Sequence, residues 1–188
     1  MTTEFTLRPA EPSDALCLSV LAMQVFLDTY ALHGIRPAIA REVMSSYAES
    51  VFLRDIESAQ SAIIVAEREH HLVGFAQVTF GATHEMAPDG QQAELLRLYV
   101  QEPFTRRRLG TGLLAQAERL ARDAGATVLW LTPWVYNHRA LQFYTRCGYT
   151  DHGLTWFTFE GESHENRVFA RQLMSAVTVL EGSENGDR

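Results

Sequence analysis

The spacing of apolar residues changes several times along the chain, and each change predicts a different element. Alternation over residues 5–10 is typical of a short edge strand, whereas residues 11–30 open with Pro-Ser-Asp and carry apolar residues at helical intervals. Residues 37–58 continue the helical pattern, as one broken helix or two short ones. Two β-rich runs, 61–67 and 72–80, are separated by a polar segment, which predicts a hairpin.

The second half of the chain alternates between strands and helices. Residues 93–100 form a third β-type run, and a helix is predicted from about Gly110 to Ala124. A buried strand, a helix closed by Gly148 and two further strands follow, at residues 127–132, 137–147, 149–159 and 166–173. The acidic segment EGESHE, residues 160–165, is predicted to be the loop between the last two strands. Together, these elements predict a mixed α/β domain without repeats.

Composition indicates an ordinary globular domain, because 46% of the residues are hydrophobic and 21% are charged. We expect one domain over residues 1–175 and a polar tail at 176–188. The net charge of −7 argues against nucleic acid or an anionic membrane as a partner. No segment approaches the ~20 apolar residues of a spanning helix, and the N-terminus does not read as a secretion signal. A cytoplasmic protein is therefore expected.

Cysteine and histidine give no sign of a metal site. Cys17 and Cys147 lie far apart without zinc-binding spacing, and we expect both to be buried free thiols. The histidines are scattered, and the adjacent pair His70 and His71 indicates a hairpin tip. We therefore assign no metal.

Residues 105–121, TRRRLGTGLLAQAERLA, place three arginines and two glycines directly before an amphipathic helix. Gly110, Gly112 and Ala115 satisfy a loose dinucleotide pattern, but no strand leads directly into the turn and no Gly-Lys-Ser/Thr follows. The remaining interpretation is a pyrophosphate site. The pattern Arg107-x-x-Gly110-x-Gly112 stands at a helix start, where unpaired N–H groups and the helix dipole favour binding of a pyrophosphate. The alternative for the arginines is a solvated helix face.

Two stretches in this order carry a family resemblance: LRLYVQEPFTRRRLGTGLL, residues 96–114, and NHRALQFYTRCGY, residues 137–149. They resemble the GNAT superfamily of acetyl-CoA-dependent N-acetyltransferases, whose pyrophosphate motif is Gln/Arg-x-x-Gly-x-Gly/Ala after a strand. The resemblance covers most of residues 4–173 and is strongest from Glu94 to Tyr149. It implies a central mixed sheet of about six to seven strands flanked by helices.

The resemblance also implies how acetyl-CoA is held. The implied cofactor-binding residues are Leu98, Tyr99, Val100, Arg106, Arg107, Arg108, Leu109, Gly110, Thr111, Gly112, Asn137 and Tyr144. Tyr144 is the implied general acid for the departing thiolate, and a core aromatic is the alternative. Asn137 is expected to contact the pantetheine arm, to cap its helix, or both.

The acceptor amine needs a proton acceptor, and Glu94 holds the implied position, acting directly or through a water. An exposed strand-end carboxylate is the alternative. Leu96 stands where related sequences sometimes carry a second acid. Glu162 and Glu165, with Glu160, are expected to form an acidic rim that holds a distal ammonium, and an acidic tip that serves only solubility is the alternative.

The expected function is transfer of the acetyl group of acetyl-CoA to a primary amine by direct attack in a ternary complex. The whole-chain resemblance is greatest to bacterial polyamine (spermidine/spermine) N-acetyltransferases. Two alternatives stay open: a protein N-terminal or lysine acetyltransferase, and a CoA-binding regulator without catalysis. The expected partner is a small-molecule amine, and a homodimer is compatible with the family.

Overall fold

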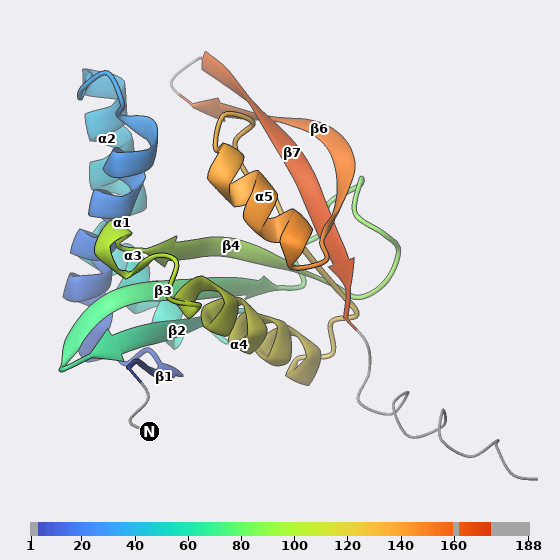
Figure 1. Ribbon diagram of the computed structural model, residues 1–188, viewed down its shortest axis with the longest axis horizontal. Coiled ribbons are helices and arrows are strands. Elements are labelled where there is room, and N and C mark those ends of the chain that lie inside the picture. The colour runs from blue at the N-terminus through green and yellow to red at the C-terminus, as the bar shows by residue number, and fades with distance from the viewer. Residues whose placement is uncertain (1–3, 160–161, 174–188) are drawn as a thin grey trace, which may run out of the picture.

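In the computed structural model, residues 4–159 and 162–173 are described, and their strands form one mixed sheet in the order β1-β2-β3-β4-β5-β7-β6 (Figure 1). The strands are β1 (Thr6–Pro9), β2 (Ser61–Arg68), β3 (His71–Phe80), β4 (Gln92–Val100), β5 (Val128–Leu131), β6 (Thr150–Phe159) and β7 (Glu162–Gln172). The helices are α1 (Ala15–Tyr30), α2 (Pro37–Ser46), α3 (Glu49–Glu57), α4 (Leu109–Asp123) and α5 (His138–Arg146), with 3-10 turns at Pro12–Asp14 and Glu102–Phe104. β4 and β5 are parallel, and the other described pairs are antiparallel. The predicted mixed sheet is confirmed.

Helices cover both faces of the first half of the sheet. α4 packs on β2, β3 and β4 from one side, and α1 and α3 pack on β2 and β3 from the other. The middle of β2, residues 62–66, is apolar because both of its faces are covered: Ile64 faces α4, whereas Ile63 and Val65 face α1 and α3. α5 lies over the second half of the sheet, against β6.

The start of α1 is anchored to the sheet. Glu11 and Asp14 form a capping box around the turn that opens with Pro12. Arg8 of β1 donates hydrogen bonds to both carboxylate oxygens of Asp14, at 2.7 and 2.9 Å, and to Glu67 of β2 at 3.0 Å. This hydrogen bonding holds the pKa of Asp14 below its usual value. The ion pair thus fixes where α1 leaves the sheet.

Several local predictions are confirmed. The two helical pieces between residues 37 and 58 are the separate helices α2 and α3. The predicted hairpin is present, but its tip is one residue earlier than the predicted His70–His71 pair: Glu69 and His70, both with positive φ, form the tight turn, and His71 is the first residue of β3.

Two predictions are wrong. β7 begins at Glu162 rather than near residue 166, so most of the segment predicted as an acidic loop belongs to the strand. Cys17 and Cys147 are free thiols, as expected, but Cys17 is exposed and Cys147 is half-buried. Cys17 lies on the outer side of α1, where an apolar residue in a helical pattern need not face the core. The predicted tail at 176–188 lies outside the described residues.

Within residues 4–159 and 162–173, no helix combines the length and apolar character needed to cross a bilayer. The same part of the chain holds no cluster of three His, Cys, Asp or Glu side chains able to bind a metal ion.

Candidate active site

The sheet opens between β4 and β5. These parallel strands pair only through Gln92–Glu94 on β4 and Val128–Trp130 on β5, although β4 continues to Val100. Beyond Glu94, no strand of the described ranges pairs with this side of β4. Figure 1 shows the two halves of the sheet diverging. The peptide groups along the open edge can therefore pair with an extended molecule that carries amides of its own.

The predicted residues Leu98, Tyr99 and Val100 lie on this open stretch of β4. Leu98 and Val100 direct their side chains into the core beneath α4. Tyr99 faces the opposite side of the sheet, where its ring centre is 5.4 Å from that of Phe75. What Leu98 and Val100 can offer pantetheine at the open edge is therefore their backbone, whereas the peptide groups of Tyr99 face β3.

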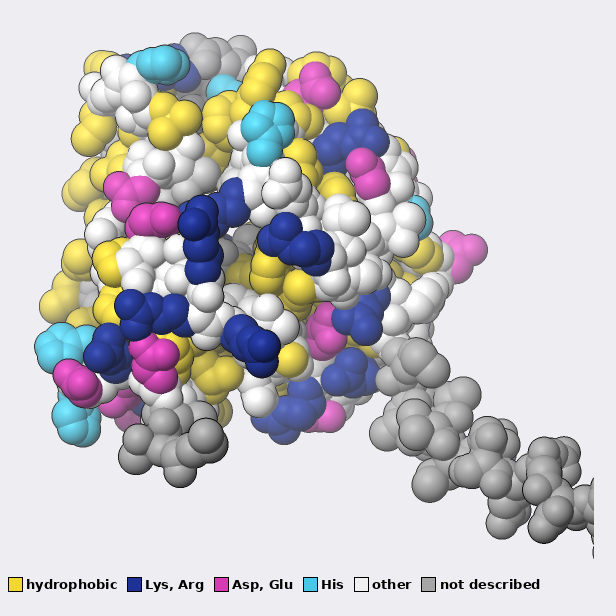
Figure 2. All heavy atoms as spheres, in the orientation of Figure 1, with side chains coloured by type: hydrophobic (Ala, Val, Ile, Leu, Met, Phe, Trp, Pro, Cys, Tyr) yellow, Lys and Arg dark blue, Asp and Glu magenta, His cyan; other side chains and the backbone are white. Residues whose placement is uncertain are grey.

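The N-terminus of α4 carries the arginine and glycine cluster. Arg106 and Arg108 adopt positive φ angles of 60° and 61°, which turn the chain sharply into the helix. Arg108 is the N-cap residue, and its side chain makes no capping hydrogen bond. The first N–H groups of the helix, on Leu109, Gly110 and Thr111, therefore point out of its end beside the three exposed arginines. Figure 2 shows basic side chains gathered on this face of the molecule.

Surface ion pairs engage part of this cluster. Arg107 pairs with Glu4, and its guanidinium lies 5.9 Å from the centre of the Phe104 ring. Arg139, in the first turn of α5, pairs with Glu102. Exposed pairs of this kind contribute only about 0–1 kcal/mol. An incoming phosphate can therefore replace these carboxylate partners at little cost.

Gly110 supplies a direct test of the phosphate interpretation. A Cβ at this position would lie 3.6 Å from Cζ of Phe143, an ordinary contact, so the fold itself tolerates alanine. Valine adds two branches at the helix end, where phosphate oxygens must approach the N–H groups. We expect Gly110→Val to raise the Kd for CoA about tenfold or more, measured by calorimetry.

Gly110→Ala is the matched control, and its Kd should change much less. A folded Gly110→Val protein that binds CoA as tightly as the unsubstituted protein would contradict the phosphate interpretation.

Asn137 caps α5. Its Oδ1 accepts a hydrogen bond from the N–H of Ala140 at 3.1 Å. The capping role that the sequence left open is thus observed. A contact with the pantetheine arm would have to come from the Nδ2 group of the same side chain.

Tyr144 lies on the buried side of α5 and is 7% exposed. Its ring packs edge-on against Phe143 and Tyr149, with centroid distances of 5.1 and 5.7 Å. Burial raises the pKa of its phenol, and the nearby Tyr30 and Tyr99 raise it further. The phenol is therefore protonated at neutral pH and can act as a proton donor.

Glu94 stands where β4 and β5 part. It is the last β4 residue paired on both sides, opposite Thr79 of β3 and Trp130 of β5. Partial burial raises the pKa of its carboxyl, and the positive charge of Arg97 acts in the opposite direction. A carboxylate with a raised pKa at the mouth of an opening is suited to accepting a proton.

A wall of aromatic rings joins α1 to the segment after β5. Tyr30, the last residue of α1, packs on Trp134 with ring centres 5.4 Å apart, and Trp134 contacts Tyr136 at 5.1 Å. Trp134 is held in place by a β-bridge to Asn166 of β7. The wall therefore reaches from the helices on one half of the sheet to the strands of the other.

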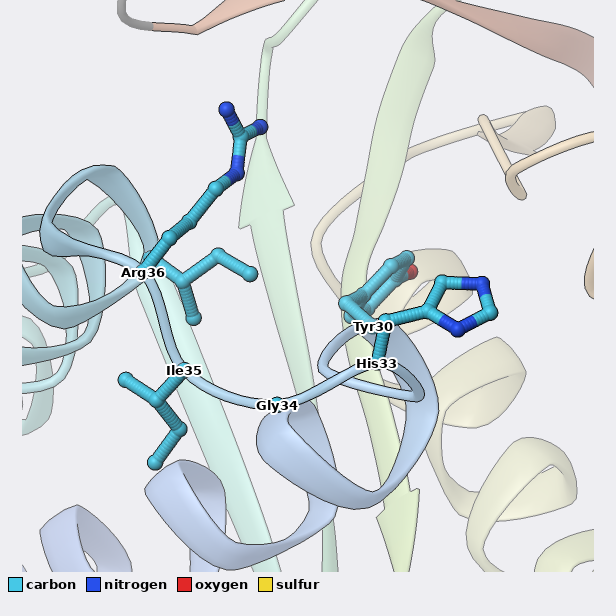
Figure 3. A pocket seen from close by; sticks show the side chains of 6 residues that line it. Tyr30, His33, Gly34, Ile35 and Arg36 are labelled. Atoms are coloured by element: carbon cyan, nitrogen blue, oxygen red, sulfur yellow. The ribbon is translucent and has the colours of Figure 1, made fainter.

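A hollow of about 410 Å³ adjoins this wall at the loop between α1 and α2. Its lining includes Tyr30, His33, Gly34, Ile35 and Arg36. Figure 3 shows Tyr30 and His33 together at one end and Arg36 extending from the other. The hollow therefore lies at the α1 end of the aromatic wall.

The predicted acidic rim is only partly described. Glu160 and the side chain of Glu162 lie outside the described residues. Glu165 is half-buried within β7 rather than at a loop tip, and its carbonyl accepts a hydrogen bond from the N–H of Val135 at 3.1 Å. Glu165 is therefore adjacent to the segment that carries Trp134.

The sequence analysis missed Tyr30, Tyr47, Arg97 and Trp134. Tyr47 follows α2, and its hydroxyl lies 3.0 Å from that of Tyr99. The aromatic runs at the end of α1 and directly after β5 were the only local signs of this cluster.

Comparisons with known proteins agree with this geometry. The profile of the "Acetyltransferase (GNAT) family" matches residues 30–149. An uncharacterised N-acetyltransferase of Mycobacterium tuberculosis is 28% identical over 144 residues, which are 73% of this chain and 87% of that protein. A spermidine N(1)-acetyltransferase of Thermoplasma acidophilum is 26% identical over 143 residues, 76% of this chain and 86% of that protein.

Solved structures share the fold. The PaiA N-acetyltransferase of Thermoplasma acidophilum, in complex with coenzyme A, superimposes with a TM-score of 0.69 at 21% identity and covers 90% of this chain and 99% of that one. The protein yncA of Salmonella typhimurium, solved with acetyl-CoA, gives a TM-score of 0.65 at 18% identity, covering 92% and 96%.

The family match, with an opened mixed sheet beside an uncapped helix N-terminus, gives the class: an acyltransferase that takes its acyl group from a coenzyme A thioester. The chain belongs to the GNAT family of acetyl-CoA-dependent N-acetyltransferases.

Proposed function

We propose that this enzyme acetylates a primary amine of a small cationic molecule, with polyamines as the leading candidates. The observation that carries the proposal is the position of Glu94 at the opening of the sheet, on the face of β4 that also carries Tyr99. The name of the spermidine N(1)-acetyltransferase relative supports the polyamine assignment.

Glu94 takes the proton of the attacking amine in this proposal. A primary amine with a pKa near ~10.4 is neutral in only about one molecule in 2,500 at pH 7, a handicap of about 4.6 kcal/mol. A carboxylate, directly or through an ordered water, can accept this proton from the bound amine and so free the nitrogen lone pair for attack. The partial burial of Glu94 makes it a stronger base than an exposed carboxylate.

Tyr144 supplies the proton to the sulfur that leaves. Acetyl-CoA, when bound, contributes an activated carbonyl and a thiolate leaving group. The backbone N–H of Val100, which faces the open edge of β4, polarises that carbonyl in this proposal. The phenol of Tyr144 starts the reaction protonated because burial raises its pKa. No covalent enzyme intermediate is needed, so the half-buried Cys147 has no assigned step.

The aromatic wall and the acidic groups suit an ammonium rather than an anion. Faces of Trp and Tyr rings attract cations, by about 0.5–2 kcal/mol each. Trp134 and Tyr136 present such rings beside Glu165, and Tyr136 is 68% exposed. A distal ammonium would therefore lie near Glu165 while the reacting amine lies near Glu94.

A panel of amines tests the proposal. Thiol release from acetyl-CoA should be fastest with spermidine or spermine, compared with aminoglycosides, amino acids and peptides. The KM for spermidine should rise with salt and should rise again, with kcat little changed, when Glu162 and Glu165 are both replaced by Gln. Glu49→Gln, at an exposed position on α3, is the matched charge control.

Other outcomes would overturn the assignment. Turnover of a neutral or anionic amine without any turnover of polyamines would remove the cation proposal. Preference for peptide N-termini or lysine side chains would identify a protein acetyltransferase. Binding of acetyl-CoA without turnover of any amine would favour a regulator.

We also propose a cytoplasmic location. The exposed free thiol of Cys17 supports a reducing compartment. The homodimer stays a prediction, which light scattering can measure.

A further inference from the structure

A β-bulge interrupts the pairing of β3 with β4. Gln77 of β3 lies opposite Arg97 of β4, but the next β3 residue, Val78, lies opposite Leu95. Leu96 is therefore the extra residue of the bulge, and it is 41% exposed. A bulge of this kind changes which side chains share a face of the strand.

The bulge places Glu94 and Arg97 on one face of β4. In an unbroken strand, residues 94 and 97 would point to opposite faces. Here Leu95 and Leu98 both enter the core beneath α4, three positions apart. Glu94 and Arg97 therefore share the other face, toward α1, α2 and α3.

A buried polar network holds this arrangement. Gln77 is 1% exposed, and its Oε1 accepts a hydrogen bond from the guanidinium of Arg97 directly across the strands. Its Nε2 donates to Oδ2 of Asp55 on α3 at 2.9 Å and to Oγ of Ser61 at 3.3 Å. Oδ2 of Asp55 is also 3.9 Å from the Arg97 guanidinium. Each end of the Gln77 amide is thus occupied.

Arg97 extends the network to the end of α2. Its side chain is 12% exposed and donates a hydrogen bond to the carbonyl of Ser46 at 3.3 Å. The guanidinium also lies 5.2 Å from the ring centre of Tyr47 and 5.5 Å from that of Phe52. The contacts of Arg97 come from β3, from α3 and from the end of α2 with the residue after it, so they fix the position of the arginine and of the strand that carries it.

We propose that Arg97 is a positioning residue for Glu94: clamped by Gln77, Asp55 and the Ser46 carbonyl, it fixes the bulge of β4 and holds a positive charge on the face of the candidate base. The proposal rests on the role proposed above for Glu94. Arg97 itself touches neither substrate in this scheme.

The charges around Glu94 make the effect of Arg97 specific. Thr79 and Trp130, which flank Glu94 on the neighbouring strands, carry no charge. Arg97 lowers the pKa of Glu94 against the effect of burial, and Asp55 is the acid paired with Arg97. The other titratable groups of this region in the described chain include Tyr30, Glu42, Tyr47 and Tyr99, with Tyr144 near Tyr30 and Tyr99. His84 also lies here, with its ring centre 5.1 Å from that of Trp130. Removing the guanidinium therefore takes away the cation that favours the ionised form of Glu94.

The test is a direct titration of Glu94 in the full chain. With carboxyl-labelled glutamate, NMR should show the Glu94 signal, assigned by its loss in Glu94→Gln, titrating at higher pH in Arg97→Met than in the unsubstituted protein. Arg97→Lys, which restores the charge, should return the titration toward its original pH. Arg97→Gln keeps hydrogen-bonding groups without the charge, and it replaces Arg97→Met if that variant does not fold.

Arg8→Met is the matched control. Arg8 is also a part-buried arginine bonded to two carboxylates, but its partners are Asp14 and Glu67. This variant should lose stability without moving the Glu94 titration. An Arg97→Met protein in which Glu94 titrates as in the unsubstituted protein would overturn the proposal, whatever its stability.

A rate measurement completes the test. With the amine that gives the highest turnover in the panel, kcat/KM at pH 7 should fall about tenfold in Arg97→Met, because the bulge that orients Glu94 is no longer held, and the Kd for acetyl-CoA should be unchanged. Arg97→Lys should recover part of that loss, and an unchanged rate in Arg97→Met would count against the proposal. If no amine is acetylated by the unsubstituted protein, the proposed function fails, whereas the titration still decides whether Arg97 controls Glu94.

Discussion

Tyr144→Phe is expected to lower kcat about 100-fold while leaving the Kd for acetyl-CoA unchanged. The substitution removes one oxygen and keeps the ring that packs between Phe143 and Tyr149. The thiolate of CoA would then leave without a proton from the enzyme. The same burial that raises the pKa of the phenol also disfavours a thiolate at that place, so proton transfer within the site is favoured over release of a bare anion.

Tyr149→Phe is the control variant: it shows what the removal of a buried tyrosine hydroxyl does when that hydroxyl has no part in catalysis. Tyr149 is 3% exposed, and its hydroxyl donates to Glu118 at 3.1 Å, on the side of α4. Its replacement should lower the melting temperature, because a buried hydrogen bond contributes about 1 kcal/mol, and should leave kcat nearly unchanged. A Tyr144→Phe enzyme with full turnover on its best amine would return Tyr144 to the role of a core aromatic.

Glu94→Gln is expected to lower kcat/KM at pH 7 about 100-fold or more, because the enzyme would then depend on the small fraction of amine that is already neutral. The shape of the pH profile is the sharper measurement. Burial raises the pKa of Glu94, so in the unsubstituted enzyme kcat/KM should fall as the pH drops through that raised pKa and the base becomes protonated. In Glu94→Gln this fall of kcat/KM at low pH should be absent. Its kcat/KM should instead rise steadily toward alkaline pH.

Glu67→Gln serves as the comparison. Glu67 is a carboxylate on β2 with a salt bridge to Arg8, away from the opening of the sheet. Its replacement should leave the pH profile of kcat/KM unchanged. If kcat/KM of Glu94→Gln still falls at low pH as it does in the unsubstituted enzyme, a different group is the base.

The order of elements was predictable because most of them carry a periodic pattern that depends only on neighbouring residues. α4 and β2 are examples: α4 is amphipathic at helical spacing, and the middle of β2 is apolar because helices cover both of its faces. The start of β7 was not predictable. Glu162–Glu165 is polar in sequence, and a polar strand at the end of a hairpin has the same composition as a loop.

The candidate site was predictable only in part. The family resemblance located Glu94, Tyr144 and the helix start at Gly110, whose roles stay predictions. The contact of Tyr30 with Trp134 joins residues more than a hundred positions apart, and no local pattern encodes it. The bulge at Leu96 is likewise invisible in β4 alone, because it depends on the register against β3.

The open edge of β4 has a thermodynamic consequence. From Leu95 to Val100 the strand lacks a neighbour on one side within the described chain, so its backbone hydrogen-bonding groups on that side have no partner strand in the protein alone. A thioester arm that pairs along this edge binds the native state and not the unfolded chain. By mass action, a ligand at a hundred times its Kd stabilises the native state by about 2.7 kcal/mol. The resistance of this enzyme to heat and to proteolysis should therefore rise and fall with the supply of acetyl-CoA around it.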